Sequence, residues 1–289
     1  MKRLIILGIA LLAIVTSKNL QAQDQTGAAS ERRIPLDNFY IKENNIGRVP
    51  QPFPHVREAD VYLKRRIWRM IDFREKFNQF FYFPIQPVQD RVSFMSMVMK
   101  GLEDGSLEAF DDATDDFSKP LTFEELMAKH TRVVQRTMTD EDDPDITITR
   151  WDTLRFSNED VLLLRLKEDW FIDRQRGVRD NRILGLAPVR LRFDDAGDFR
   201  GFITMFWLYY DWCRDVFVNT EAFNRHNSAQ RMSYDDVFAM RRFFNSYIYK
   251  VDNQQDREIG QFREGQAVAR EARRLAIELL NLEEDLWVY

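Results

Sequence analysis

Hydrophobic positions between Arg57 and Ile85 recur at the spacing of an α-helix. At about 100° per residue, one arc of this helix is apolar and the opposite arc is basic. Pro84 would end the helix, because the residue before a proline is steered away from helical angles. The pattern therefore predicts a long amphipathic helix whose apolar arc is buried. The apolar arc contains Leu63, Ile67, Met70, Ile71, Phe77 and Phe81, and the basic arc contains Arg65, Arg66, Arg69 and Lys76.

Four later stretches also carry helical spacing. Val88–Leu102 repeats methionine and valine on one side, and Thr122–Glu125 is a capping box that would start a helix near Phe123. Ser233–Asp236 opens a third stretch, in which apolar residues recur at helical intervals up to Ile248. The clearest pattern is the C-terminal one, which predicts an amphipathic helix that packs on the domain or on another subunit. Its apolar positions are Val268, Ala272, Leu275, Leu279, Leu282 and Leu286.

Between these helices the period changes to that of β-strands. Ile146–Trp151 alternates apolar and polar β-branched residues, and Val161–Ile172 favours a strand over a helix. Arg182–Phe193 is a further strand, in which Pro188 indicates an edge or a bulge. Phe202–Tyr210 is almost wholly apolar and predicts a central strand buried on both faces. The predicted fold class is α+β, with a helical N-terminal part, antiparallel or mixed strands in the middle and amphipathic helices at the C-terminus.

The first 22 residues have the pattern of an export signal. Lys2 and Arg3 precede an apolar run that is too short to span a bilayer, and Ala22 offers a small residue for cleavage. Residues 23–55 contain four prolines and predict an extended arm, either a loose leader or a segment that docks onto a neighbour. Residues 56–289 form the predicted α+β domain, with a possible internal boundary at residues 140–145.

Charge and cysteine content narrow the class of protein. Without residues 1–22 the chain would have 39 basic against 47 acidic residues, a net charge of −8. An acidic chain of this kind is unlike nucleic-acid-binding proteins, so no nucleic-acid partner is expected. Cys213 is the only cysteine, and its apolar surroundings predict a buried, inert thiol.

A search for catalytic motifs finds none that is specific. The three histidines are isolated, and no zinc, phosphate-loop or nucleophile-elbow spacing occurs. A catalytic Cys213–His226 pair is not expected, because the apolar surroundings of Cys213 raise a thiol pKa. The polar cluster from Glu168 to Arg176 is interpreted as a salt-bridge network in preference to an acid–base pair. We therefore expect no catalytic residue, no cofactor and no metal site.

The basic arc is the candidate partner-binding site. Four cations on one helical face repel each other unless carboxylates answer them. The chain's own acidic loops, Asp111–Asp116 and Asp140–Asp145, would serve, and so would those of a neighbouring subunit. The predicted binding residues are Arg65, Arg66, Arg69 and Lys76.

Several of these stretches resemble one known family. The run READVYLKRRIWRMIDFREKFNQFFYFP from Arg57 to Pro84 is similar to the gliding motility protein GldN family, also called PorN. The resemblance continues in Leu166–Val189, in Tyr234–Lys250 and in the C-terminal helix with its ending Asp285–Tyr289.

The resemblance implies a non-enzymatic, soluble periplasmic component of the type IX secretion system of Bacteroidota. It implies association with an outer-membrane lipoprotein, GldK or PorK, and self-association in a ring beneath the outer membrane. It also implies a link to the inner-membrane motor components GldL/PorL and GldM/PorM. The alternative from the residues themselves is a periplasmic module that binds peptidoglycan or carbohydrate through the aromatic segments Phe80–Phe83 and Phe206–Tyr210.

Overall fold

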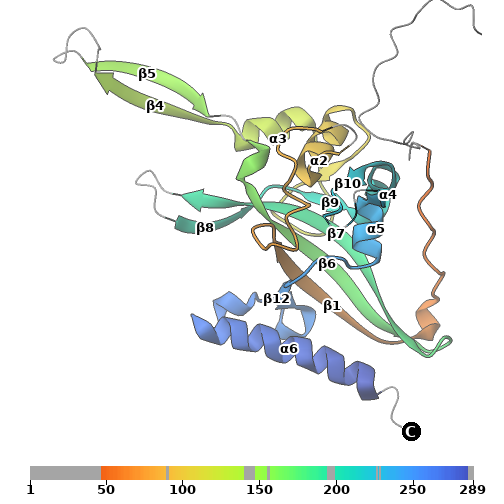
Figure 1. The fold of residues 1–289 in the computed structure, drawn as a ribbon. Helices are drawn as coiled ribbons and strands as arrows, with labels where there is room; N and C mark the ends of the chain where they lie inside the picture. The colour runs from red at the N-terminus through yellow and green to blue at the C-terminus, as the bar shows by residue number, and fades with distance from the viewer. Residues whose placement is uncertain are drawn as a thin grey trace, which may run out of the picture. The chain divides into compact units, whose positions relative to one another are not determined.

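An antiparallel sheet of eight strands organises the chain (Figure 1). The computed structural model describes residues 47–88, 91–139, 147–154, 157–193, 199–225, 227 and 229–285, all within one compact unit. The strands follow the order β12-β1-β6-β7-β9-β2-β3, and β8 pairs with β7 beside β9. Their bounds are β1 Val61–Asp72, β2 Ala109–Phe110, β3 Pro120–Leu121, β6 Val161–Asp173, β7 Val178–Phe193, β8 Phe199–Thr204, β9 Trp207–Tyr209 and β12 Tyr247–Val251.

Helices and two small sheets complete the described part. The helices are α2 Phe94–Glu103, α3 Phe123–His130, α4 Tyr210–Asn219, α5 Tyr234–Ala239 and α6 Gln266–Glu284. Single 3-10 turns are η1 Glu58–Asp60, η2 Asn158–Asp160, η3 Asp252–Gln254 and η4 Ile259–Gln261. The small sheets pair β4 Arg132–Thr139 with β5 Thr147–Leu154 and β10 Glu221–Ala222 with β11 Met232–Ser233. The α+β class and the C-terminal helix are confirmed. No described helix is long and apolar enough to cross a membrane.

The predicted N-terminal helix is wrong, because Val61–Asp72 is the long strand β1. β1 lies between β12 and β6 and pairs antiparallel with both. Its second half is buried on both faces, with Ile67 fully buried and Trp68 3% exposed. Two-sided burial removes the alternation by which a strand is recognised, and the remaining apolar residues happen to fit a helical period.

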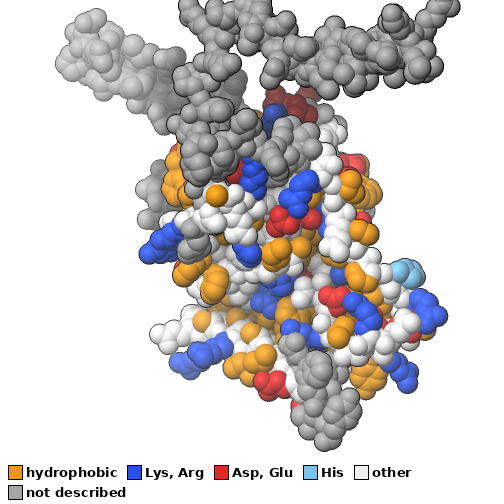
Figure 2. Space-filling model, turned by 45° about the vertical axis from the view of Figure 1, so that its right-hand side comes forward, with side chains coloured by type: hydrophobic (Ala, Val, Ile, Leu, Met, Phe, Trp, Pro, Cys, Tyr) orange, Lys and Arg blue, Asp and Glu red, His pale blue; other side chains and the backbone are white. Residues whose placement is uncertain are grey.

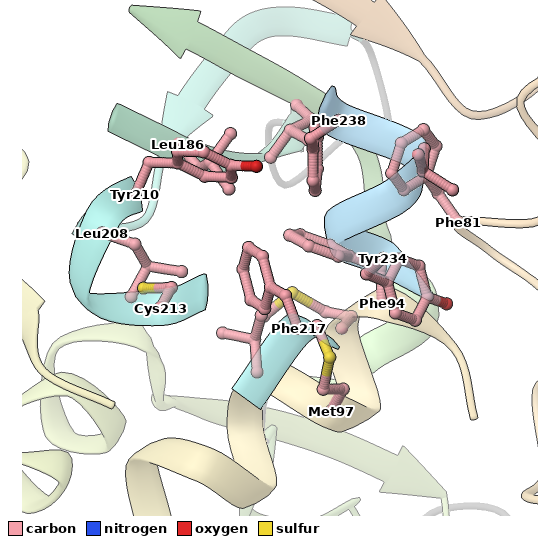
Figure 3. Packing of buried hydrophobic residues seen from close by; sticks show 14 of the residues in the cluster. Phe81, Phe94, Met97, Leu186, Leu208, Tyr210, Cys213, Phe217, Tyr234 and Phe238 are labelled. Carbon is pink, nitrogen blue, oxygen red and sulfur yellow. The ribbon is translucent and has the colours of Figure 1, made fainter. Parts of the chain in front are cut away.

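Each face of the sheet carries its own core. On one face, Ile71, Leu164 and Leu186 pack under α2, α4 and α5. Figure 3 shows aromatic side chains from these helices pointing toward a common interior. α6 covers the same face at the β1–β12 edge through Ala272, Leu275 and Leu279. On the other face, a smaller cluster gathers Trp68, Met70, Phe110, Leu163, Ala187, Val189, Trp207 and Tyr249.

Local capping signals agree with the structure where they are complete. Thr122 and Glu125 form the predicted capping box of α3, which ends at His130. Ser233 and Asp236 form a second box at α5. The predicted continuation of α5 to Ile248 is wrong, since Arg241 has a φ of 50° and Ile248 lies in β12. From this position the guanidinium of Arg241 reaches the buried Glu168.

The apolar run Phe202–Tyr210 is not one central strand as predicted. It divides into the end of β8, whose Phe202 is 45% exposed, and the buried strand β9. The N–H of Met205 donates to the carbonyl of Pro188 at 2.9 Å. In an antiparallel sheet the backbone N and O atoms of one residue face the same neighbouring strand. The nitrogen of Pro188, which has no hydrogen to donate, therefore faces the gap between β8 and β9. The proline therefore stands in a central strand where its partner strand breaks.

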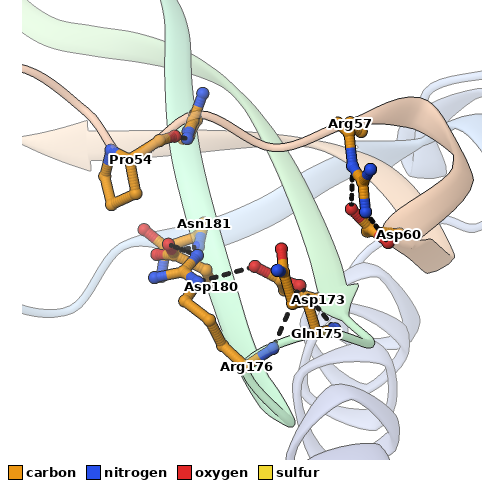
Figure 4. Close-up of polar contacts among 9 residues, drawn as sticks. Pro54, Arg57, Asp60, Asp173, Gln175, Arg176, Asp180 and Asn181 are labelled. Atoms are coloured by element: carbon orange, nitrogen blue, oxygen red, sulfur yellow. Dashed lines mark hydrogen bonds and ion pairs between the residues drawn. The ribbon is translucent and has the colours of Figure 1, made fainter.

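The turn between β6 and β7 holds the polar cluster singled out in the sequence (Figure 4). The carboxylate of Asp173 accepts hydrogen bonds from the backbone N–H of Gln175 at 2.8 Å and from Nε of Arg176 at 2.6 Å. Arg176 also reaches Asp180 at 3.0 Å, and Gly177 supplies the positive φ of 63°. The cluster is thus paired within the chain, but Arg176 pairs with Asp173 and Asp180 and not with Glu168 or Asp169.

His130 gives the fold a dependence on pH. Its ring is 3% exposed, and Nε2 lies 3.1 Å from the carbonyl oxygen of Met205. Burial lowers the pKa of His130 below its ordinary value of 6.5, with Arg190 and Lys129 acting in the same direction and the Met205 carbonyl and Asp112 against it.

We expect the stability that neutral His130 contributes to be lost as pH falls. The unfolded chain binds a proton at higher pH than the folded chain, so this contribution is complete above 6.5 and disappears through the lowered pKa. Urea unfolding of wild type and His130→Gln at pH 7.5 and pH 5 measures it. The advantage of the wild type should shrink at pH 5, whereas His55→Gln, at an exposed position, should follow the wild type at both values. An unchanged advantage at pH 5 would contradict the assignment.

Candidate partner-binding surface

The predicted basic arc does not form one face. In a strand, successive side chains point to opposite faces, so Arg65 and Arg69 lie on the α6 side and Arg66 on the other. Lys76 lies beyond the strand, in the turns that follow Asp72. The structure thus separates the four predicted residues among three places.

Three of these cations have carboxylate partners within the chain. Arg65 pairs with Glu278 of α6 at 2.7 Å, and Arg66 pairs with Asp169 of β6 at 2.7 Å. Hydrogen bonds from Arg66 and Lys64 hold the pKa of Asp169 below its usual value, although burial alone would raise it. These pairs explain how a positively charged stretch is tolerated in a central strand.

Arg69 belongs to a buried polar network around Glu168. The Glu168 carboxylate is 0% exposed and accepts hydrogen bonds from Arg241 Nη2 at 2.9 Å and from Trp170 Nε1 at 2.8 Å. Arg69 Nε lies 3.5 Å from the same carboxylate, and Arg179 stacks on the Trp170 ring at 4.4 Å. This network joins β1, β6, β7 and the chain after α5, so its role is in the fold.

The acidic loop Asp111–Asp116 is likewise occupied by the chain's own groups. Asp111 pairs with Lys119 at 3.2 Å and with Lys129 at 2.8 Å. Asp115 accepts a hydrogen bond from Trp68 Nε1 at 2.6 Å, and the buried Lys167 donates to its carbonyl. The second acidic segment, Asp140–Asp145, lies outside the described residues.

Lys76 stands at a different kind of site, the mouth of an apolar pocket of about 600 Å³. The pocket is formed by the turns after β1, the segments beside β10 and β11, and the chain before β12. Several of its walls remain open to solvent, since Phe77 is 54%, Phe83 41% and Phe244 61% exposed. The apolar lining is made by Phe77, Phe80, Phe83, Val88, Phe223 and Phe244.

The rim of this pocket is positively charged. Lys76, Arg91, Arg225 and Arg242 line it, and no carboxylate is among the described lining residues. Arg91 has a partner in Glu221 at 3.6 Å, and Arg242 donates to the sulfur of Met232 at 3.5 Å. A site of this composition suits an apolar ligand that carries negative charge.

Hydrogen bonds of Asn78 join two of the segments that line the pocket. Asn78 is 0% exposed, and its Nδ2 donates to the carbonyl of Asp72 at 2.9 Å and to that of Phe244 at 2.8 Å. Its Oδ1 accepts from the N–H of Phe244 at 2.8 Å, and the rings of Phe77 and Phe244 lie 4.9 Å apart. These contacts fix the two segments that carry the exposed rings.

Most of the other residues weighed in the sequence lie in the core. Cys213 is buried as predicted, and burial raises the pKa of its thiol to about 12, which disfavours the reactive thiolate. Phe80, Phe81 and the run from Phe206 to Leu208 are also buried, which leaves Phe83 as the exposed ring of its segment. His226 lies outside the described residues.

On the face shown in Figure 2, the described side chains form no large patch of a single charge. Basic, acidic and apolar side chains are interspersed over its described atoms. The apolar pocket with its basic rim is therefore the candidate partner-binding site, of which the sequence had identified Lys76 alone. The remaining lining residues come from segments up to about 170 positions apart, so no local pattern joins them.

Comparison with models of known protein families gives a match over most of the chain. A family model described as gliding motility associated protein GldN matches residues 56–288. No curated protein matches the chain.

Proposed function

The chain belongs to the GldN family of gliding motility associated proteins, and from this premise we propose that it is a structural component of the type IX secretion and gliding machinery. In this proposal the chain is exported to the periplasm and acts there without catalysis. It associates with an outer-membrane lipoprotein of the GldK/PorK kind and with further copies of itself in a ring. The ring in turn meets the motor components GldL/PorL and GldM/PorM.

The observation that carries the proposal is the family match over 56–288, which includes both the sheet and α6. Two features of the chain support it. The N-terminal pattern of residues 1–22 is that of an export signal. The described cations of β1 are paired within the chain, whereas an open apolar pocket with a basic rim remains for a partner.

The alternative of a peptidoglycan- or carbohydrate-binding module has less support. Sugar-binding sites combine aromatic faces with polar groups that hydrogen-bond hydroxyls, commonly carboxylates and amides. The described pocket is lined by phenylalanine rings, cations and the amides of Gln79 and Asn224, but by no carboxylate, and most of the aromatic segments proposed for sugar binding are buried.

The proposal predicts what co-purifies with the native protein. Affinity purification of the tagged chain from native envelopes should recover an outer-membrane lipoprotein in near-equal amount, eluting together as a very large particle. Mass spectrometry identifies the partners. A monomer without a protein partner that is retained on isolated cell wall would overturn the proposal in favour of the alternative.

A further inference from the structure

The sequence of this chain contains a segment whose chemistry matches the apolar pocket with its basic rim. We propose that it binds the C-terminal tail Glu284–Tyr289 of a second copy of this chain. The tail reads Glu284-Asp285-Leu286-Trp287-Val288-Tyr289, two carboxylates followed by four apolar residues. This contact would be one of the interfaces through which copies of the chain associate in the proposed function. The closure of such contacts into a ring rests on that proposed function, whereas the contact itself does not.

Charge and polarity match between the two surfaces. The rim carries Lys76, Arg225 and Arg242, and the described lining offers them no carboxylate. The tail places its two carboxylates immediately before its apolar residues, so one bound segment can meet both rim and interior. A volume of about 600 Å³ lies within the range of pockets that enclose a ligand of several side chains.

The pocket of the same molecule is out of reach of its own tail. The C-terminal end of α6 lies at the beginning of β1, where Glu278 pairs with Arg65 and Leu282 adjoins Leu63. The pocket adjoins the other end of β1, because Asn78 bonds both Asp72 and Phe244.

The two ends of β1 are well separated. Arg65 and Asp72 are seven residues apart in the strand, which corresponds to about 23 Å at about 3.3 Å per residue. From Asp285 to Trp287 an extended chain covers at most about 7 Å, and to Tyr289 about 14 Å. A tail that fills this pocket must therefore come from another copy.

The resulting contact is heterologous, because a tail on one copy meets a pocket on the next. Such a contact repeats head to tail and closes into a ring when its rotation allows. The tail and the pocket of each copy lie at opposite ends of β1, so one molecule can donate its tail and accept another at the same time.

Cysteine cross-linking between copies tests the contact. One full-length chain carries Val288→Cys, and a differently tagged chain carries Phe244→Cys in the pocket. Mild oxidation with copper phenanthroline joins the two thiols, the oxidant taking their two electrons and two protons. The matched control is Met240→Cys, since Met240 and Phe244 are both 61% exposed and Met240 does not line the pocket. The native Cys213 is buried.

We expect a disulfide-linked pair of differently tagged chains with Phe244→Cys and at least ten-fold less with Met240→Cys. A chain that carries both Val288→Cys and Phe244→Cys should likewise cross-link between copies and not within one. Equal yields at positions 244 and 240, or a bond within one molecule, would overturn the proposal.

A peptide measurement separates this contact from the function of the whole machine. A fluorescent peptide of residues 281–289 is titrated against the full chain carrying Trp287→Ala, whose own tail then competes less. Lys76→Glu with Arg225→Glu should weaken binding at least ten-fold, because the rim then repels the carboxylates of the tail. The fold should be unaffected, since no described ion pair is lost with either residue. Unchanged affinity of the double variant would overturn the proposal, because the basic rim would then play no part in binding. Equal binding of a scrambled peptide would also overturn it, by showing general attraction of anionic amphiphiles.

The two proposals fail in different ways. Peptide binding without a co-purifying lipoprotein would retain the contact and remove the proposed machine. A very large particle that forms equally well from Trp287→Ala and wild-type chains would retain the machine and remove the contact.

Discussion

Replacement of Glu168 by alanine is expected to lower the free energy of unfolding by about 3–5 kcal/mol, the usual cost of removing one partner from a buried ion pair. Glu168 is 0% exposed, accepts hydrogen bonds from Arg241 and Trp170, and forms an ion pair with Arg69. Without it, two guanidiniums face each other in a site where burial already lowers the pKa of Arg69. Urea unfolding followed by tryptophan fluorescence measures the change.

The matched control for Glu168 is another glutamate that pairs with a β1 arginine. Glu278 pairs with Arg65 at 2.7 Å, yet its side chain is 36% exposed. Water and neighbouring groups can replace such a contact, so Glu278→Ala should cost at most about 1 kcal/mol. Equal losses for the two variants would contradict the assignment of Glu168 as the centre of a buried network.

Phe81→Ala is expected to produce the second large effect, about 3–5 kcal/mol of unfolding free energy. The Phe81 ring is fully buried and lies 4.4 Å from Phe80, 5.2 Å from Phe73 and 5.5 Å from Phe238, measured between ring centroids. Its removal leaves a cavity between rings that are held by α2, α5 and the turns after β1, so the surroundings cannot close around it (Figure 3).

The neighbouring Phe83 provides the control for this cavity. It belongs to the same turn but is 41% exposed at the pocket, so Phe83→Ala should cost about 1 kcal/mol or less. The two variants are compared by chemical unfolding at pH 7.5. A Phe81→Ala loss no greater than that of Phe83→Ala would show that the aromatic cluster is loosely packed.

Elements that depend on neighbouring residues were predictable from the sequence. The capping boxes at Thr122 and Ser233 each place two hydrogen bonds within four residues, so the starts of α3 and α5 follow from short motifs. The amphipathic helix α6 was equally clear, because it covers one edge of the sheet with a single apolar stripe. Its position Leu286 lies outside the described residues.

β1 was misread because its environment is set by distant segments. Arg65 and Arg69 lie on the same buried side as Ile67, and their charges are met by Glu278 and Glu168. These carboxylates lie about 100 and more than 200 positions further along the chain. A helical plot assigns the two arginines to a solvent-facing arc because it contains no information about such partners.

The candidate site was largely invisible for the same reason. Helical spacing places Phe77 on a buried arc and the apolar residues between Ser233 and Ile248 on one helical stripe, yet the rings of Phe77 and Phe244 are both more than half exposed. They meet because Asn78 bonds the backbone on both sides of Phe244. That arrangement depends on tertiary contacts between segments about 165 residues apart, and the sequence marks it by no period.

The edges of the main sheet restrict how copies of this chain can join. At one edge, β3 has two residues and begins with Pro120, which has no N–H to donate. At the other edge, β12 has five residues, and the backbone of its Lys250 already forms an antiparallel β-bridge with Glu258. β8 is bent by Gly201, which has a φ of 136°, and its register with β7 shifts. Growth by strand addition is therefore disfavoured at each of these edges of the main sheet.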